Sequence, residues 1–411
     1  MNLPLSGDRL WADLMEMAKI GGTPKGGCNR QALTDLDAEG RKLLESWCAA
    51  IGLTLSVDRF GNMGFWRPGR DPSRKPVAIG SHLDTQPTGG KFDGVLGVLT
   101  GLEVLRALHE AGVETEAPLL LINWTNEEGA RFSPPMMGSG AAMGLFSAAE
   151  TLARTDGQGF TFGGELARIG YAGTEELPDF DAYFEVHIEQ GPVLERENLS
   201  VGVVTHALCQ AWYEVTVHGE DAHGGSAMAG RRDAMVGAAE LIAAIEGIAL
   251  TTLTPAGEPG RATVGRLLVT PDSRNVVPSK IWFSVDMRHS DEEALAAMGV
   301  ALRAEGAAIA ARRHLEVEVE DFWFSPLVQF DPVLVGHVRD AARRLGIPHR
   351  DMPTAIGHDA VYVARKKPAT MIFTPCHGGI SHNEAESITQ GWAEAALRVL
   401  AEAVIAAAGP K

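Results

Sequence analysis

Cysteine and basic residues are scarce in this chain of 411 residues, and each scarcity excludes a class of protein. The four cysteines, Cys28, Cys48, Cys209 and Cys376, form no CxxC pair, so we expect reduced thiols in a cytoplasmic protein. Lys and Arg total 36 against 53 for Asp and Glu, which gives a formal net charge of -17. Because phosphate backbones and anionic lipids are also negative, we expect no nucleic-acid partner and no membrane-surface partner.

Long apolar runs are also missing. No uninterrupted apolar run reaches the length of a membrane span, so we expect no membrane segment. The opening residues, MNLPLSGDRLWADLMEMAKIGG, mix acidic with apolar side chains and lack a basic segment followed by an apolar one, so no secretion signal is expected. The composition, 45% apolar and 22% charged, is typical of a packed globular protein, and the length predicts two domains.

Four apolar segments end in the same way, passing from continuous apolar residues into His, Asp or Glu. They are KPVAIGSHLDT, APLLLINWTNEE, DAYFEVHIEQG and ATMIFTPCHGGISHNE. Continuous apolar runs of this length predict strands buried on both faces, and helical patterns such as GVLTGLEVLRALHEAG lie between them. We therefore predict an α/β fold, a mixed sheet covered by helices, with a ligand crevice at the carboxyl ends of the strands.

A different pattern occupies residues 208–323. Its successive segments predict strand, helix, strand, strand, helix and strand, which is the βαββαβ order of ferredoxin-like domains. They are AWYEVTVHG, RRDAMVGAAELIAAIEG, RATVGRLLVT, KIWFSVDMRH, DEEALAAMGVALRAEGAAIAARR and HLEVEVEDF. We predict that this domain is inserted into a catalytic domain formed by residues 1–207 and 324–411.

The residues that follow the four apolar runs are imidazoles and carboxylates, which zinc and manganese bind well. They are His82, Asp93, Glu127, Glu128, His187 and His382. A single histidine after a strand is more often an ordinary polar residue than a ligand, but four such clusters favour a metal site. One zinc needs three or four ligands, so the surplus indicates two metals, roughly 3.5–4 Å apart as in co-catalytic hydrolases.

Two details around these residues indicate how the site works. Glu127 and Glu128 are adjacent, so in an extended loop their side chains point in different directions. One can hold metal while the other acts as a general base toward water, although NEEG alone would be read as a solvated turn. Asp84 lies two residues after His82 and would suit a partner that orients this imidazole.

Several longer segments closely resemble the binuclear-metal M20 hydrolases, in particular their zinc-dependent hydantoinase/carbamoylase branch. That branch includes N-carbamoyl-L-amino acid amidohydrolases, β-ureidopropionases and allantoate amidohydrolases. The resemblance covers nearly the whole chain, and the long form of the HIEQGPVLE segment indicates this branch rather than the M20 peptidases. The segments are GSHLDTQPTGGKFDGVLGV, TNEEGARFSPPMMGS, FEVHIEQGPVLE and GISHNEAES.

The resemblance implies a role for each residue of the predicted metal site. Its metal ligands would be His82, Asp93, Glu128, His187 and His382. Asp93 would bridge the two ions, His82 and His382 would be terminal ligands of different ions, and Glu127 would be the general base. Two divalent ions are implied, with zinc favoured, and the same ligands accept manganese, cobalt or nickel.

For the inserted domain, the resemblance implies a lid that also forms a homodimer. HGEDAHGGSAMAGRRDA resembles a His-Ala-Gly segment of the family, which implies that His223 stabilises an oxyanion at the scissile carbonyl. Gly224 stands where the family usually has alanine. Without the resemblance, an ordinary surface-loop histidine would be the alternative reading of His223, although the less favoured one. His223 would act within its own chain or from the partner subunit.

Other segments imply substrate contacts. PDSRNVVP and VDMRHS resemble segments that supply Asn275 and Arg288 to the substrate carboxylate, which the planar guanidinium matches bidentately. ALCQAWYEV would supply Gln210, which could otherwise form a hydrogen bond at a domain hinge. TAIGHDAVYVA resembles a Ser-Gly-Ala-Gly-His-Asp-Ala loop, so Gly357 and His358 would lie near the substrate. The residues before Gly357 are bulkier here, so the pocket is expected to differ in shape.

The expected reaction is hydrolysis of the ureido C–N bond of an N-carbamoyl-L-amino acid or β-ureidopropionate, giving the amino acid, carbon dioxide and ammonia. Allantoate is the nearest alternative substrate, and an M20 aminoacylase or dipeptidase is a more distant alternative. A catalytically dead small-molecule binder would lack ligands or the base, and every one of these positions is filled. A purely structural protein would have no reason to place ligand-type residues at four strand ends.

Overall fold

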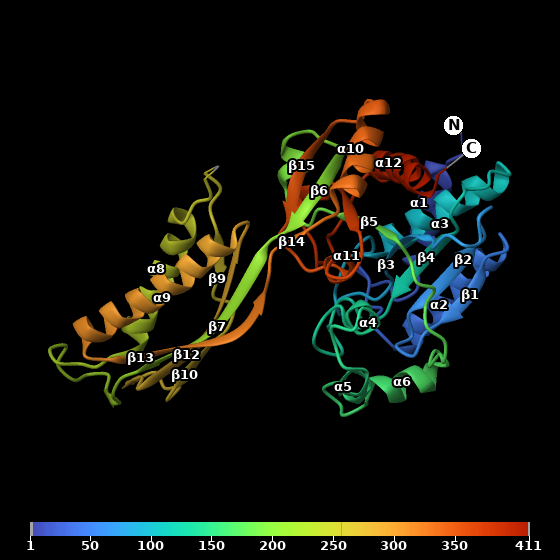
Figure 1. The fold of residues 1–411 in the computed structure, drawn as a ribbon. Helices are drawn as coiled ribbons and strands as arrows, with labels where there is room; N and C mark the ends of the chain where they lie inside the picture. The colour runs from blue at the N-terminus through green and yellow to red at the C-terminus, as the bar shows by residue number, and fades with distance from the viewer. Residues whose placement is uncertain (1–2, 256, 410–411) are drawn as a thin grey trace. The chain divides into compact units, whose positions relative to one another are not determined.

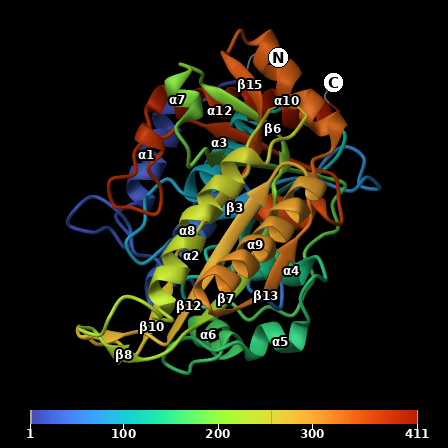
Figure 2. The ribbon, with the colours of Figure 1, turned by 90° about the vertical axis from the view of Figure 1, so that its left-hand side faces the viewer.

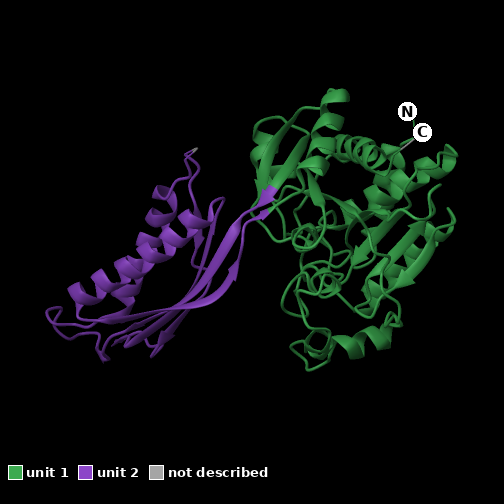
Figure 3. Ribbon diagram, in the orientation of Figure 1, with its two compact units in different colours: residues 1–205, 329–411 green, residues 206–328 purple. Residues whose placement is uncertain are grey.

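The computed structural model describes residues 3–255 and 257–409, and the chain divides into two compact units (Figure 3). Unit 1 comprises residues 1–205 and 329–411, and unit 2 comprises residues 206–328. The sequence placed the boundaries at 207/208 and 323/324. Both observed boundaries fall within strands, β6 (Val201–Ala207) and β14 (Val328–Gln329), which are neighbours in one sheet.

Unit 1 is built on a nine-stranded mixed sheet (Figure 1). Its order is β1 (Thr54–Val57), β2 (Met63–Arg67), β4 (Leu119–Trp124), β3 (Val77–His82), β5 (Ala182–Ile188), β16 (Ala369–Thr374), β6 and β14, with β15 (His349–Thr354) also paired to β6. The four strands β4, β3, β5 and β16 run parallel, whereas β2 and β6 join them antiparallel. All residues of these four parallel strands are buried, as their continuous apolar sequences predict.

Helices pack on this sheet in two groups, and the predicted mixed α/β fold is confirmed. In the first group, α3 (Val95–Glu110) and α12 (Gln390–Ala408) contact each other and the strands β3 and β5, and they are joined by α1 (Gly7–Met17) and α10 (Pro332–Arg344). In the second, α11 (Asp359–Ala364) contacts β5 and β16 and also α4 (Met137–Ala142). The remaining helical segments are α2 (Asp35–Ala49), α5 (Ala148–Ala153), α6 (Phe162–Ile169), α7 (Val193–Arg196) and η1 (His377–Gly379).

Unit 2 contains a five-stranded antiparallel sheet and two helices (Figure 2). The sheet has the order β10 (Leu267–Thr270), β12 (Lys280–His289), β7 (Cys209–His218) and β13 (Glu316–Ser325), and β9 (Arg261–Thr263) also pairs with β12. The helices α8 (Ala234–Thr251) and α9 (Glu292–Arg313) follow β7 and β12 in the chain. A separate ribbon pairs β8 (Ala222–His223) with β11 (Val276–Val277).

The two faces of the unit 2 sheet differ. Along β7 and β12, alternate residues are fully buried in a core shared with α8 and α9, for example Val215 and Phe283. The residues between them point to the other side, as the period of two in a strand requires. We call that side the open face; on these strands it carries Gln210, Trp212, Glu214, Thr216, His218, Lys280, Trp282, Ser284, Asp286 and Arg288.

Helices α8 and α9 are long and apolar enough, by length and composition alone, to cross a membrane. Neither helix is an unbroken apolar run, because charged residues such as Glu240 and Arg303 interrupt a sequence rich in alanine. The core helices of a globular protein can have the same length and composition. In the structure, Leu241 and Leu302 of these helices are fully buried in the core of unit 2.

A buried ion pair connects α2 to the loop that follows β4. Nε of Arg41 donates to Oδ2 of Asp37 at 2.9 Å, and both side chains are at most 1% exposed. Nη2 of Arg41 donates to Oγ1 of Thr125 at 3.1 Å, and Nη1 donates to the carbonyl of Gly61 at 2.7 Å. Thr125 directly precedes Asn126 and Glu127, so this pair fixes the start of the loop that carries both glutamates.

We expect Asp37→Asn to lower the free energy of unfolding of unit 1 by about 3–5 kcal/mol, because it leaves the buried Arg41 without its counter-charge. Asp35→Asn is the matched control: Asp35 lies on the same helix, but its side chain is 83% exposed. Its loss should cost at most about 1 kcal/mol. Urea unfolding followed by tryptophan fluorescence measures both, and equal effects would contradict the role given to the buried pair.

Candidate metal centre

The predicted metal-site residues of unit 1 lie at the carboxyl ends of its four parallel strands. His82 is the last residue of β3, His187 is the penultimate residue of β5, and Glu127 and Glu128 follow β4. Asp93 precedes α3, and His382 follows β16 after a short turn. Parallel strands such as β3, β4 and β5 (Figure 1) end at the same edge of a sheet. Residues up to 300 positions apart in the sequence, His82 and His382, therefore both lie beside Asp93.

One cluster is fully buried and consists of His82, Asp93 and His187. Nε2 of His187 lies 3.0 Å from Oδ1 of Asp93, and Nε2 of His82 lies 3.8 Å from the same oxygen. Gly94 makes room for this arrangement, because its φ is +68° and a Cβ there would lie 2.3 Å from the His82 ring. Only glycine fits at this position.

A second cluster consists of Asp93, Glu128 and His382. Nε2 of His382 lies 3.2 Å from Oε2 of Glu128 and 3.4 Å from Oδ2 of Asp93. The two oxygens of Asp93 thus face different histidines. The His382 side chain is 47% exposed, which distinguishes this cluster from the buried one.

The hydrogen bonds of the buried histidines fit metal ligation. Nδ1 of His82 donates to the carbonyl of Asp84 at 2.9 Å, and Nδ1 of His187 donates to the carbonyl of Ile188 at 3.0 Å. A carbonyl only accepts, so the proton of a neutral imidazole sits on Nδ1 and Nε2 presents its lone pair. Among the described residues, neither Nε2 has a hydrogen-bond partner, although both are buried and face carboxylate oxygens. A divalent cation between these groups would satisfy all of them.

The electrostatics of the site also favour a cation. Burial opposes protonation of His187, yet Asp93 and Glu185 outweigh it and raise the pKa of His187 to about 9. Hydrogen bonds to Asp93 and Glu128 raise the pKa of His382 to about 10. The cluster therefore draws positive charge toward its carboxylates, which is the condition for binding a divalent metal.

Glu127 lies beside the buried cluster and is itself 6% exposed. Its Oε2 is 3.5 Å from Nε2 of His82. Burial, followed by the charges of Asp359 and Glu128, raises the pKa of Glu127 well above its usual value. A carboxyl with a raised pKa both accepts and returns a proton near neutral pH, as a general base and acid must.

Asp84 supports this loop in a way the sequence did not indicate. Its side-chain oxygens accept the backbone N–H groups of Glu127 and Glu128, each at 3.2 Å. His82 is held instead by the backbone carbonyl of Asp84, and the nearest side-chain oxygen of Asp84 is 4.0 Å from Nδ1 of His82. The carboxylate of Asp84 thus orients the two glutamates.

The predicted substrate residues of unit 2 fall into two pairs. Gln210 and Arg288 stand opposite each other on β7 and β12, both on the open face. His223 lies on the β8–β11 ribbon, where the amide of Gly224 donates to the carbonyl of Asn275 at 2.6 Å. Gln210 is near the start of β7 and the ribbon follows its end (Figure 2), so roughly 26 Å of strand at about 3.3 Å per residue separates the two pairs.

Gly357 and His358 lie in unit 1, just before α11. The ring of His358 is 4.4 Å from the ring of His187 and is 1% exposed, and burial lowers the pKa of His358 well below its usual value. A Cβ at Gly357 would lie 2.7 Å from the Met136 side chain. His358 also forms a third group of potential ligands with Glu185 and His187.

The family model of Peptidase family M20/M25/M40 matches residues 78–406. The chain belongs to this family. It is 48% identical over 408 residues to the N-carbamoyl-L-amino-acid amidohydrolase of Rhizobium meliloti, covering 98% of this chain and 97% of that one. It is 34% identical to the ureidoglycolate hydrolase of Arabidopsis thaliana, covering 90% and 80%. A hydantoinase/carbamoylase family amidase from Burkholderia multivorans shares its structure with a TM-score of 0.93, at 49% identity and 98% coverage of both chains.

This M20 chain also places three polar residues around its metal-site carboxylates that sequence reasoning missed. Gln86 donates from Nε2 to Oε2 of Glu128 at 2.8 Å. Gln190 and Ser381 donate to Oδ2 of Asp93 at 2.9 and 3.0 Å. All three residues lie inside segments that resemble the family. Sequence spacing alone, however, does not distinguish a metal ligand from a residue that forms a hydrogen bond to a ligand.

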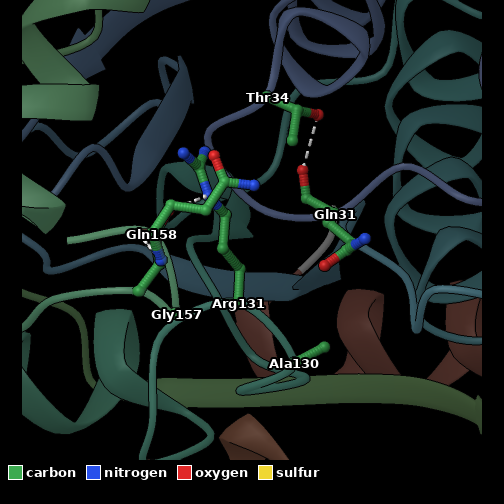
Figure 4. Close-up of a pocket in the computed structure, with 7 residues that line it drawn as sticks. Gln31, Thr34, Ala130, Arg131, Gly157 and Gln158 are labelled. Carbon is green, nitrogen blue, oxygen red and sulfur yellow. Dashed lines mark hydrogen bonds and ion pairs between the residues drawn. The ribbon is translucent and has the colours of Figure 1, made fainter. Parts of the chain in front are cut away.

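A cavity of about 310 Å³ lies next to the loop that carries Glu127 and Glu128 (Figure 4). It is lined by Gln31, Thr34, Ala130, Arg131, Asp156, Gly157 and Gln158. The Arg131 guanidinium donates hydrogen bonds to the carboxylate of Asp156 at 3.0 Å, to that of Glu165 at 2.6 Å and to the carbonyl of Leu33 at 2.8 Å. The cavity contains none of the predicted site residues, and we read it as a hollow at the base of the loop.

We expect the two clusters of this M20 protein to bind one divalent ion each with different affinities, because one cluster is buried and the other includes the half-exposed His382. His382→Ala should lower the metal content to about one ion per chain, whereas His187→Ala, which removes a candidate ligand from the buried cluster, should weaken binding at both. Metal analysis after dialysis, with titration by a chromophoric chelator, measures this. His377→Ala, whose side chain is 46% exposed in the same segment, is the control. Equal losses in the His382 and control variants would contradict the expectation.

Proposed function

We propose that this protein is a metal-dependent amidohydrolase that cleaves the ureido C–N bond of N-carbamoyl-L-amino acids, giving the amino acid, carbon dioxide and ammonia. The observation that carries the proposal is the buried carboxylate and imidazole centre with Glu127 at its side, 3.5 Å from Nε2 of His82. The similarity to the Rhizobium meliloti amidohydrolase over nearly the full length supports the reaction and the substrate class.

The residues of unit 1 divide the chemistry between them. His82, Asp93, Glu128, His187 and His382 would hold two divalent ions, with zinc favoured by the imidazole ligands. Such ions polarise a carbonyl and lower the pKa of water. Glu127 takes a proton from the attacking water and returns it to the leaving nitrogen, for which its buried, raised-pKa carboxyl is suited. Asp84 keeps the Glu127 backbone in place through its hydrogen bond.

The residues of unit 2 would bind the rest of the substrate. Arg288 pairs with the substrate carboxylate, Gln210 adds a polar contact from the opposite strand, and Asn275 assists at the carboxylate. His223 donates a hydrogen bond to the oxyanion that forms at the carbamoyl carbon. His358 and Gly357 shape the wall of the pocket beside the metal ligands.

The separation of the two residue pairs on unit 2 supports a homodimer. A small substrate is only a few ångströms long, so it cannot touch Gln210 at one end of β7 and His223 beyond the other end of the same rigid sheet. We propose that unit 2 acts as a lid and dimerisation domain, and that each site receives Gln210 and Arg288 from one chain and His223 and Asn275 from the other. Such closed two-fold dimers are the commonest oligomers.

Among ureido acids, N-carbamoyl-L-amino acids are the first choice and β-ureidopropionate the second. Allantoate remains an alternative, and the similarity to the Arabidopsis ureidoglycolate hydrolase makes ureidoglycolate another compound worth testing. We further propose that the protein works in the cytoplasm without a nucleic-acid or membrane partner, which its four unpaired cysteines and its charge of -17 support.

The reaction is tested by ammonia release from N-carbamoyl-L-amino acids, β-ureidopropionate, allantoate and ureidoglycolate, with an N-acetyl amino acid and a dipeptide assayed for free amine. We expect rapid release from the first class, lost on chelation, and at least about a 10³-fold loss of kcat in Glu127→Gln with its metal content unchanged. Cleavage of only the acetyl compound or the dipeptide would indicate an aminoacylase or dipeptidase instead. Binding without cleavage of any compound would indicate a non-catalytic binder.

The shared site is tested by mixing two inactive variants, Glu127→Gln and His223→Ala, under conditions that let subunits exchange. If His223 acts across the dimer, half of the dimers are mixed and each contains one complete site, so about a quarter of the wild-type activity should return. A control mixture of Glu127→Gln with His187→Ala should recover much less, because both changes lie in unit 1 and one of them removes a ligand. No recovery in the first mixture would place His223 in the site of its own chain.

A further inference from the structure

Arg288 and Asp286 form an ion pair on the open face of unit 2. Nε of Arg288 donates to Oδ1 of Asp286 at 3.0 Å and to Oδ2 at 3.2 Å, and Nη2 donates to Oδ2 at 2.6 Å. The two residues lie two positions apart on β12, so their side chains leave the strand on the same face. Each side chain is 26% exposed, so the pair is neither fully buried nor freely solvated.

The pairing fixes the plane of the guanidinium. A guanidinium carries five N–H bonds in one rigid plane, and Asp286 takes those of Nε and one of Nη2 from the side. The edge formed by Nη1 and Nη2 carries a second parallel pair of N–H bonds, the geometry that matches another carboxylate bidentately. Because Asp286 sets the plane of the guanidinium, it also sets the direction of this second edge.

Asp286 is itself held between neighbouring strands. In the sheet register it stands opposite Trp212 on β7 and opposite Thr263 on β9. The Trp212 ring in turn packs against the Trp323 ring at 4.9 Å. Directly opposite residues have their Cβ atoms about 4.5–5.5 Å apart, so Asp286 has little freedom to change its rotamer. A short, confined carboxylate thus makes a bidentate contact with a long side chain.

We propose that Asp286 is a positioning residue that holds the Arg288 guanidinium in the orientation in which it receives the substrate carboxylate. The inference rests on the proposed function, in which Arg288 binds that carboxylate. Fixing an arginine side chain costs rotamer entropy, and a contact that fixes it beforehand removes part of this cost from binding. Asp286 therefore assists substrate binding although it carries the same charge sign as the substrate.

A simple competition model predicts the opposite sign. If Asp286 only occupied Arg288, its removal would release the guanidinium and lower KM. If Asp286 positions Arg288, its removal raises KM. A purely structural role would damage the turnover of every substrate alike. The direction of the change in KM, and its dependence on the substrate carboxylate, therefore separate the three cases.

The experiment compares wild-type protein with Asp286→Asn and Asp286→Glu on an N-carbamoyl-L-amino acid and on its carboxamide, which lacks the carboxylate. For Asp286→Asn we expect KM for the carboxylate substrate to rise roughly 10-fold with kcat changed by at most about twofold, and the carboxamide to be turned over as by wild type. Asp286→Glu, which keeps the charge, should recover most of the loss. A lower KM, or an equal loss on both substrates, would overturn the proposal.

Glu214→Gln is the matched control. Glu214 also lies on the open face of the sheet, and its Oε2 accepts a hydrogen bond from Nε1 of Trp282 at 3.2 Å. Its replacement removes one negative charge from the same face without touching Arg288. We expect KM for the carboxylate substrate to remain at the wild-type value. A rise equal to that in Asp286→Asn would show that only the net charge of the face matters.

A second measurement does not depend on turnover. In protein labelled with ¹⁵N-arginine, the Nε–H signal of Arg288 is assigned by its loss in Arg288→Lys, and its exchange with solvent is followed by NMR. We expect exchange several times slower in wild type and Glu214→Gln than in Asp286→Asn, and equal rates would overturn the proposal. If wild type cleaves no ureido compound, the proposed function fails, while the exchange rates still decide whether Asp286 holds Arg288.

Discussion

The buried charge at Asp93 is the constraint on which the structure of unit 1 depends. A carboxylate that is 3% exposed and surrounded by three histidines cannot be tolerated in a folded core without a precise set of partners. The parallel strands bring those partners together, because each delivers its polar residues to the same edge. The buried pair of Arg41 and Asp37 and the carboxylate of Asp84 hold the glutamate loop from outside, so the site is supported by groups that do not belong to it.

Much of this arrangement follows from the sequence. The four continuous apolar runs predicted the parallel strands, and the change from apolar to His, Asp or Glu at their ends predicted which side chains would meet. The residues that hydrogen-bond to the metal-site carboxylates did not follow from the sequence. Gln86 and Gln190 contact Glu128 and Asp93, which lie far from them along the chain. Asp84 illustrates the same limit: its position beside His82 is visible in the sequence, but the backbone amides that its carboxylate accepts are 43 and 44 residues away.

The domain boundaries show another limit. Composition and Gly or Pro content mark loops, whereas this chain passes between its units within the strands β6 and β14, whose sequences look like any other strand. The alternation along β7 and β12, in contrast, predicted the two strands, whereas their register, which places Gln210 opposite Arg288, came from the structure. The ion pair between Arg288 and Asp286 could not be predicted from the sequence. An aspartate two residues before an arginine is common on the surface of strands and does not by itself indicate such a pair.

The length of β7 has a consequence for how such chains can change during evolution. The strand connects Gln210 at its start with the His223 ribbon beyond its end, so its residue count determines the reach of the domain. An insertion of one residue would move every later side chain to the opposite face, and an insertion of two would restore the face but lengthen the reach by roughly 6–7 Å. Relatives that keep one residue pair at each end of β7 should therefore vary in the loops around β7, while the length of β7 stays constant.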